Sequence, residues 1–141
     1  MKLDTSHTLY KQADVSCSRP QLVLLLCDGA IRYLREASDH LQAGRWAEKG
    51  RAVDAAHECL RELRRGLDFN QGGEVAATLD KMYDFLGTKL MIANIKREPE
   101  QFRQIIQSLE GMRDAWRELF QRLQSEGRLA EVNEFQPTVL R

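Results

Sequence analysis

Apolar residues recur at alternating intervals of three and four positions in four stretches of this chain, and this spacing restricts the folds open to it. Residues three and four apart lie on the same side of an α-helix, so each stretch predicts a helix with one apolar face. The four predicted helices span residues 19–41, 45–66, 74–95 and 98–123. No stretch shows the apolar–polar alternation of a half-buried strand. We therefore predict an all-α fold, an antiparallel up-down four-helix bundle.

The repeating positions of each helix are the predicted core of the bundle. In the first two helices they are Leu22, Leu25 or Leu26, Gly29, Tyr33 and Ala37, then Val53, Ala56, Leu60, Leu63 and Leu67. In the last two they are Val75, Leu79, Met82, Leu86, Leu90 and Ala93, then Phe102, Ile105, Leu109, Met112, Trp116, Leu119 and Leu123.

Turn-forming residues divide the chain. Ser18 is a suitable N-cap for the first helix, Gly44 ends that helix, the turn over residues 67–73 contains two glycines, and Pro99 opens the last helix. With 141 residues, the chain has the size of one domain. We expect a flexible N-terminal segment over residues 1–17, a helical bundle domain over 18–126 and a C-terminal tail over 127–141.

Composition narrows the classes of partner. Lys plus Arg and Asp plus Glu both number 21, and a net charge of zero gives no electrostatic reason to expect nucleic acid or an anionic membrane as the main partner. The longest apolar run, residues 22–27, is far shorter than the ~20 residues that cross a bilayer. Residues 1–18 lack the apolar centre of a signal peptide, and three cysteines without CxxC spacing suit reduced thiols. We expect a cytosolic (cytoplasmic) protein without membrane insertion.

No pattern in the sequence predicts catalysis, a cofactor or a metal site. Neither an HExxH motif nor a phosphate-binding Walker loop is present. A di-iron bundle would need Glu-x-x-His pairs, and none of the three histidines, His7, His40 and His57, follows a Glu by three positions. We therefore expect no metal, no cofactor and no catalytic residue, and a protein that is not an enzyme.

The first and third helices carry more apolar residues than one face can bury. A helix that is apolar on several sides either packs on both flanks or offers a surface to a partner. We interpret the surplus as a groove for an amphipathic helix of another protein. The candidate groove residues are Val23, Cys27, Ile31, Leu34, Phe85, Ile92 and Ile95. Tyr10, an aromatic residue in a polar segment, is the candidate for an N-terminal lid over this groove.

Three ordered blocks of the sequence resemble the flagellar secretion chaperone FliS family. Residues 22–34 read LVLLLCDGAIRYL and resemble the family's LVxxLYDGAxxxL opening helix. Residues 63–94 resemble its second block, with LDF, GGEVA, MYDF and a closing Ala-Asn. Trp116 resembles its closing block, and Tyr10 lies where the family has an N-terminal tyrosine. The chain departs from the family pattern at Cys27, where an aromatic residue is usual, and at Pro20, which comes one position late.

The resemblance implies an antiparallel helical bundle that works as a cytosolic export chaperone. It would bind the disordered C-terminal segment of flagellin, one chaperone per flagellin, prevent premature polymerisation and deliver the complex to the flagellar type III export gate. Three alternatives stay open: a generic helical adaptor with another client, a metal-dependent bundle, and a regulator that binds flagellar regulatory proteins.

Overall fold

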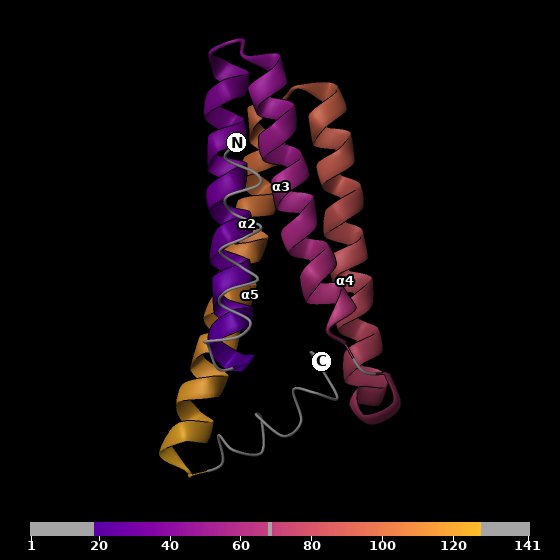
Figure 1. Ribbon diagram of the computed structural model, residues 1–141, viewed down its shortest axis with the longest axis vertical. Helices are drawn as coiled ribbons and strands as arrows, with labels where there is room; N and C mark the ends of the chain where they lie inside the picture. Colours follow the sequence, from indigo (N-terminus) through magenta and orange to yellow (C-terminus); the bar gives the residue numbers. More distant parts are fainter. Residues whose placement is uncertain (1–18, 68, 128–141) are drawn as a thin grey trace.

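The computed structural model describes residues 19–67 and 69–127, and this part of the chain folds as four helices without a strand. The helices are α2 (Arg19–Gln42), α3 (Trp46–Arg65), α4 (Phe69–Lys96) and α5 (Pro99–Ser125) (Figure 1). The predicted all-α four-helix fold is confirmed. The predictions for Tyr10, for the Ser18 N-cap and for most of both terminal segments concern residues outside those described, so the division into three segments stays a prediction.

The four helices form a closed ring in which each helix packs against two others. α2 packs against α3 and α5, and α4 also packs against α3 and α5, so α2 and α4 lie diagonally opposite each other. Short links enforce the antiparallel order. At the first link Gly44 has φ +75°, and the Arg45 amide donates to the His40 carbonyl at 2.9 Å, which closes the end of α2. Pro99 occupies the first turn of α5, as predicted.

Helix α4 begins earlier than the sequence predicts. Residues 67–73 are predicted as a turn, whereas helical structure already starts at Phe69. Gly73 interrupts it with φ 52° and ψ −129°, a conformation that glycine adopts without steric cost. The uninterrupted part of α4 therefore follows Gly73, which accounts for the predicted start at Glu74.

Helix α2 supplies much of the core because α3 and α5 pack against it more extensively than they pack against α4. Its buried apolar residues are Val23, Leu26, Cys27, Ala30, Ile31, Tyr33, Leu34, Ala37 and Leu41. Ion pairs join its surface to α5: the Arg113 guanidinium donates to Asp28 at 3.1 Å, and Arg35 donates to Glu110 at 2.6 Å. These pairs are partly exposed, so they fix the position of α5 on α2 more than they add stability.

Two leucines of α2 test this packing. Leu34 is fully buried and Leu25 is 36% exposed. We expect Leu34→Ala to lower the free energy of unfolding by about 2–5 kcal/mol, because it leaves a cavity in the core. The matched Leu25→Ala change should cost less than about 1 kcal/mol. Urea unfolding followed by circular dichroism measures both, and equal losses would contradict the assignment of the core.

Candidate binding surface

Four of the seven predicted groove residues lie in the core. Val23, Cys27, Ile31 and Leu34 on α2 are each no more than 1% exposed. The prediction that they lie off the core-facing side of their helix is wrong, because α3 and α5 pack on two sides of α2 and enclose both flanks of its apolar surface. In this structure they do not line an open surface, and a role for them in binding a partner stays a prediction.

The other three predicted groove residues are exposed on α4. Phe85 is 61% exposed, Ile92 42% and Ile95 76%. Val75 and Met82, which are predicted as core, are exposed as well, at 62% and 42%. The additional apolar residues of α4 are therefore exposed, whereas those of α2 are buried.

The core-facing side of α4 is shifted by one residue from the prediction in its first half. The buried or partly buried positions are Ala76, Leu79, Tyr83, Leu86, Leu90 and Ala93. Ala76 is buried in place of the predicted Val75, and Tyr83 in place of the predicted Met82. In each pair both adjacent residues fit a repeat of three and four positions, so the repeat alone does not decide which of them faces the core. Tyr83 is thus a core residue that the repeat did not predict. Burial raises the pKa of its phenol far above the usual range.

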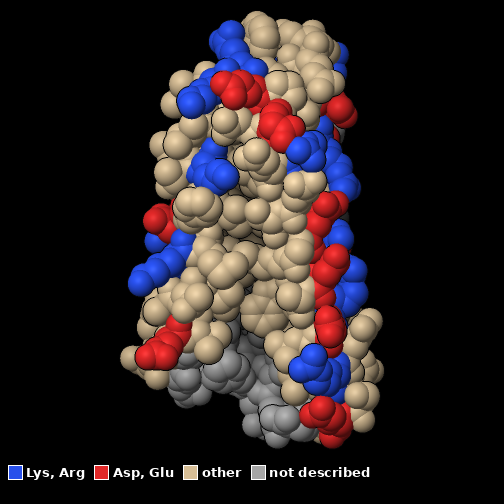
Figure 2. All heavy atoms as spheres, turned by 180° about the vertical axis from the view of Figure 1, so that it is seen from behind, with Lys and Arg blue, Asp and Glu red and all other residues tan. Residues whose placement is uncertain are grey.

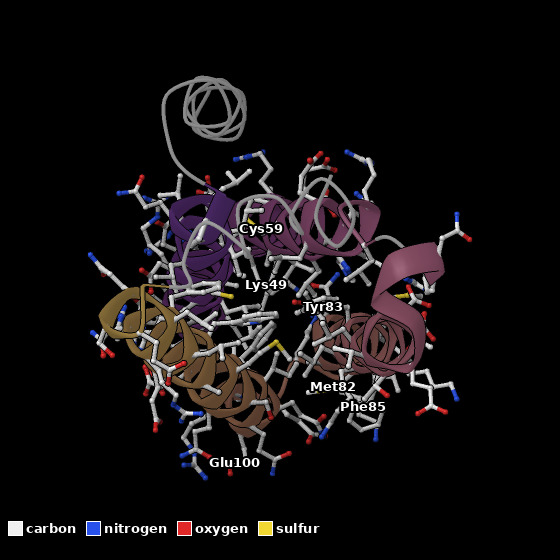
Figure 3. The ribbon with its side chains drawn as sticks, turned by 90° about the horizontal axis from the view of Figure 1, so that it is seen from below. Lys49, Cys59, Met82, Tyr83, Phe85 and Glu100 are labelled. Carbon is white, nitrogen blue, oxygen red and sulfur yellow. The ribbon has the colours of Figure 1, made fainter. Side chains whose placement is uncertain are left out.

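Val75, Met82, Phe85 and Ile92 form what we call the outer face of α4. Their spacing of seven, three and seven residues keeps them on one side of the helix. Seen from the end of the bundle, Met82 and Phe85 lie on the outside of α4 whereas Tyr83 lies toward the interior (Figure 3). Figure 2 shows uncharged side chains filling the middle of the rear surface between margins of charged residues, with a hollow in its lower half. An apolar surface with polar margins is typical of a protein-binding site.

Polar contacts hold α4 to α3 along its length. Arg64 donates to Asp80 at 2.5 Å and to Asp84 at 3.1 Å. At the other end of α3 the Lys49 ammonium donates to the Asn94 carbonyl at 2.9 Å. Lys49 is almost fully buried, and burial together with Arg97 lowers its pKa. The edge of α4 that faces α3 is therefore fixed, and the outer face is turned away from these contacts.

His57 and Gly87 mark a close contact between α3 and α4. A Cβ atom built on Gly87 would lie 3.9 Å from the His57 ring, which is ordinary van der Waals distance. Burial of the ring and the nearby Arg61 lower the pKa of His57, and Asp54 partly opposes them. The neutral imidazole is thus the form that suits the packed α3–α4 interface.

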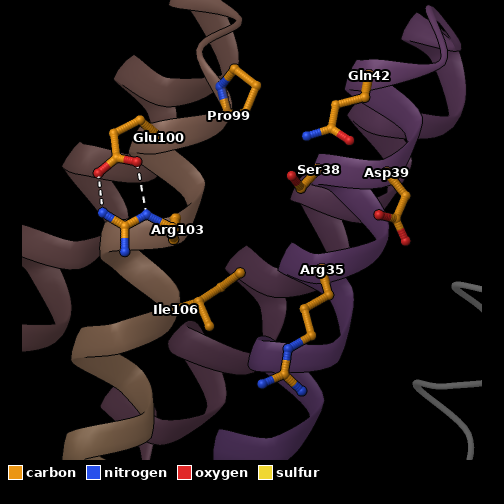
Figure 4. A pocket seen from close by; sticks show the side chains of 8 residues that line it. All are labelled: Arg35, Ser38, Asp39, Gln42, Pro99, Glu100, Arg103 and Ile106. Carbon is orange, nitrogen blue, oxygen red and sulfur yellow. Dashed lines mark hydrogen bonds and ion pairs between the residues drawn. The ribbon is translucent and has the colours of Figure 1, made fainter.

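A second surface feature is a cavity of about 380 Å³ between α2 and the start of α5, and four charged residues are among those that line it (Figure 4). Three of the four charged side chains that line it are already paired, since Arg103 donates to Glu100 at 2.7 Å and Arg35 donates to Glu110. Asp39 is the remaining charged group, so the cavity does not bring several unpaired charges together for a ligand. Within residues 19–67 and 69–127 no group of three or more His, Cys, Asp or Glu is placed to hold a metal ion. None of the helices there is long and apolar enough to cross a membrane.

Comparison with known proteins gives one consistent family. The family model described as Flagellar protein FliS matches residues 3–123. The Flagellar secretion chaperone FliS of Salmonella typhimurium is 31% identical over 110 residues, which cover 77% of this chain and 82% of the relative. That of Vibrio cholerae is 30% identical over 112 residues, covering 76% and 82%. That of Bacillus subtilis is 27% identical over 122 residues, covering 86% and 90%.

The environment of Cys27 predicts an unreactive thiol. Burial, followed by the neighbouring Asp28 and Cys59, raises the pKa of Cys27 to about 12. Because the thiolate is the nucleophile, we expect iodoacetamide at about pH 8 to leave Cys27 unmodified in the folded protein and to alkylate it in concentrated urea. Peptide mass spectrometry reads each cysteine separately. Rapid alkylation of Cys27 without denaturant would show that α2 is accessible.

The shifted pKa of His57 predicts a dependence of stability on pH. Above the unfolded-chain pKa of about 6.5 the residue is neutral in both states. As the pH falls below that value the unfolded chain takes up the proton more readily, so the free energy of unfolding decreases. Urea unfolding at a series of pH values should show a larger decrease for the unmodified chain than for His57→Gln. If the free energy of unfolding falls equally with pH in both proteins, the folded environment of His57 does not lower its pKa.

Proposed function

Because this chain belongs to the Flagellar protein FliS family and is a flagellar export chaperone, we propose that its client is the disordered C-terminal segment of flagellin. In this proposal one chaperone holds one flagellin in the cytosol, prevents premature polymerisation and delivers the complex to the flagellar type III export gate. The observation that carries the proposal is the exposed apolar outer face of α4.

The length of the outer face supports the proposal of a helical client. From Val75 to Ile92 it extends about 25 Å at ~1.5 Å per residue, which is long enough for several turns of a client helix. A disordered segment that folds on binding loses conformational entropy, and burial of a large apolar area has to offset that loss. An extended apolar face supports this role better than a compact pocket would.

The buried part of the predicted groove has a different place in the proposal. Val23, Cys27, Ile31 and Leu34 could contact the client only after a neighbouring element moves, so we assign the first contact to α4. We propose that the N-terminal segment, through Tyr10, covers apolar surface when no client is bound. Release at the export gate requires only a competing partner. A partner that binds the client-free chaperone raises the population of client-free chaperone by mass action.

Substitutions on α4 test the client surface. We expect Phe85→Ala and Ile92→Ala each to weaken binding of the flagellin C-terminal segment about tenfold, because truncating a central apolar contact of an interface typically costs more than ~1 kcal/mol. Isothermal titration calorimetry with flagellin from the same organism measures the affinity. Leu25→Ala, on α2, is the control and should bind like the unmodified chain.

The outcomes of this titration separate the alternatives. Saturable 1:1 binding with a gain of helix and a negative heat-capacity change supports the chaperone proposal. Absence of binding to the unmodified chain would remove flagellin as the client and favour another helical partner.

The lid has its own test. Deleting residues 1–15 should raise the binding of an apolar dye and change the affinity for the client, because covered apolar surface becomes accessible. If dye fluorescence and client affinity both stay as in the full chain, Tyr10 does not act as a lid.

A further inference from the structure

The helices of the bundle diverge towards the end at which α5 stops. In Figure 1 the pair α2 and α5 lies on one side, the pair α3 and α4 lies on the other, and the two pairs separate towards the lower end. The start of α4 and the end of α5 both lie there, and the rear surface is hollowed in its lower half (Figure 2). We call residues 75–83 of α4 and 112–123 of α5 the open end of the bundle.

The apolar side chains of α5 become less buried towards the open end. In the first half of the helix the residues of the apolar repeat are at most 1% exposed, namely Phe102, Ile105 and Leu109. The same repeat continues through Met112, Trp116, Leu119 and Leu123. Yet Leu119 is 37% exposed and the other three are only partly buried. The second half of α5 thus carries apolar side chains that the described residues do not fully cover.

Helix α4 shows the same change along its length. Leu86 and Leu90, away from the open end, are at most 4% exposed, whereas Leu79 is only partly buried and Met82 is 42% exposed. On α5, Trp116 stacks on the buried ring of Phe120 with 5.4 Å between the ring centroids. Among the described residues the core is therefore incomplete at the open end, and additional apolar side chains could pack there.

The chain itself continues from this end of the bundle. Gly127 has φ +72° and its amide donates to the Gln124 carbonyl at 3.1 Å, which ends α5 and turns the chain out of the helix direction. Residues 128–141 follow and lie outside those described. They can span up to about 45 Å at ~3.3 Å per residue, whereas Leu119 lies only about 12 Å back along α5 at ~1.5 Å per residue. The segment is therefore long enough to return to the open end.

The sequence of residues 128–141 provides apolar side chains at a regular interval. Before Pro137, every third residue is apolar: Leu129, Val132 and Phe135. Residues three apart are neighbours on one side of a helix, so the spacing favours a segment with one apolar side. Residues 1–18 also join the bundle at this end, through Arg19 at the start of α2. They are the alternative occupant, but they lack such an interval.

We propose that residues 128–141 fold back from Gly127 and cover the open end, with Leu129, Val132 and Phe135 packed against Trp116 and Leu119. In this arrangement the C-terminal segment completes the core of its own bundle. Because the segment is attached to the site that it covers, the contact does not depend on protein concentration. The contact belongs to the free chain and does not depend on which client the chain binds.

The fluorescence of Trp116 tests this contact in the full-length chain. The chain has two tryptophans, and Trp46→Phe leaves Trp116 as the only one. Removing the apolar side chains of the segment should let water reach the indole. We therefore expect stronger quenching by acrylamide and emission at longer wavelength after the combined changes Leu129→Ser, Val132→Ser and Phe135→Ser.

A matched variant controls for changes in the segment that do not remove apolar side chains. It carries Asn133→Ser, Gln136→Ser and Thr138→Ser, and its Trp116 fluorescence should equal that of the Trp46→Phe parent. Circular dichroism checks that both variants keep the helix content of the parent, so that exposure of Trp116 is not a loss of fold.

The possible results are distinct. Stronger quenching in the first variant alone, at every protein concentration tested, supports the proposal. Unchanged quenching in that variant would overturn it, and exposure of Trp116 only after deletion of residues 1–15 would assign the open end to the N-terminal segment. If the parent itself is quenched more strongly on dilution, as sedimentation shows dimers dissociating, the covering segment comes from a second copy and folding back within one chain is wrong.

Discussion

Burial of α2 between α3 and α5 is the constraint on which the rest of the structure depends. Because α3 and α5 pack against this helix more extensively than against α4, its apolar residues belong to the core, and the partner-binding surface that we propose lies on another helix. Helix α4 packs on its own two neighbours with one apolar side and keeps a second apolar side in solvent. Helix α4 therefore contributes to the core with one side and to the proposed binding surface with another, whereas the buried apolar residues of α2 belong to the core.

The same arrangement explains how a small bundle can expose apolar residues and remain folded. Polar contacts hold α4 to α3, from Arg64 at one end to Lys49 at the other. These contacts keep α4 in position although the side chains of its outer face do not pack in the core. Helix α5 is fixed independently through Asp28 and Glu110. In the proposed function, the free energy of client binding comes from covering apolar surface.

The sequence predicts the number, order and approximate bounds of the helices because the three-and-four repeat is a local signal. It misplaces the first half of the core-facing side of α4, since Val75–Ala76 and Met82–Tyr83 are adjacent pairs that both fit the repeat. It also cannot tell whether the second apolar side of α2 is covered by this chain or by a partner, because that depends on contacts with α3 and α5. The Asp28–Arg113 pair joins residues 85 positions apart and leaves no local pattern.

Methionine methyl signals test the central claim most directly. Met82 lies on the outer face of α4, whereas Met91 lies seven residues after Asp84, on the edge that Arg64 ties to α3. Both are exposed, at 42% and 57%, so both signals can respond to a bound partner. Titration of ¹³C-methyl-methionine-labelled protein with the flagellin C-terminal segment should shift the Met82 signal and leave Met91 in place. A shift of Met91 with an unchanged Met82 would contradict the assignment of the binding surface.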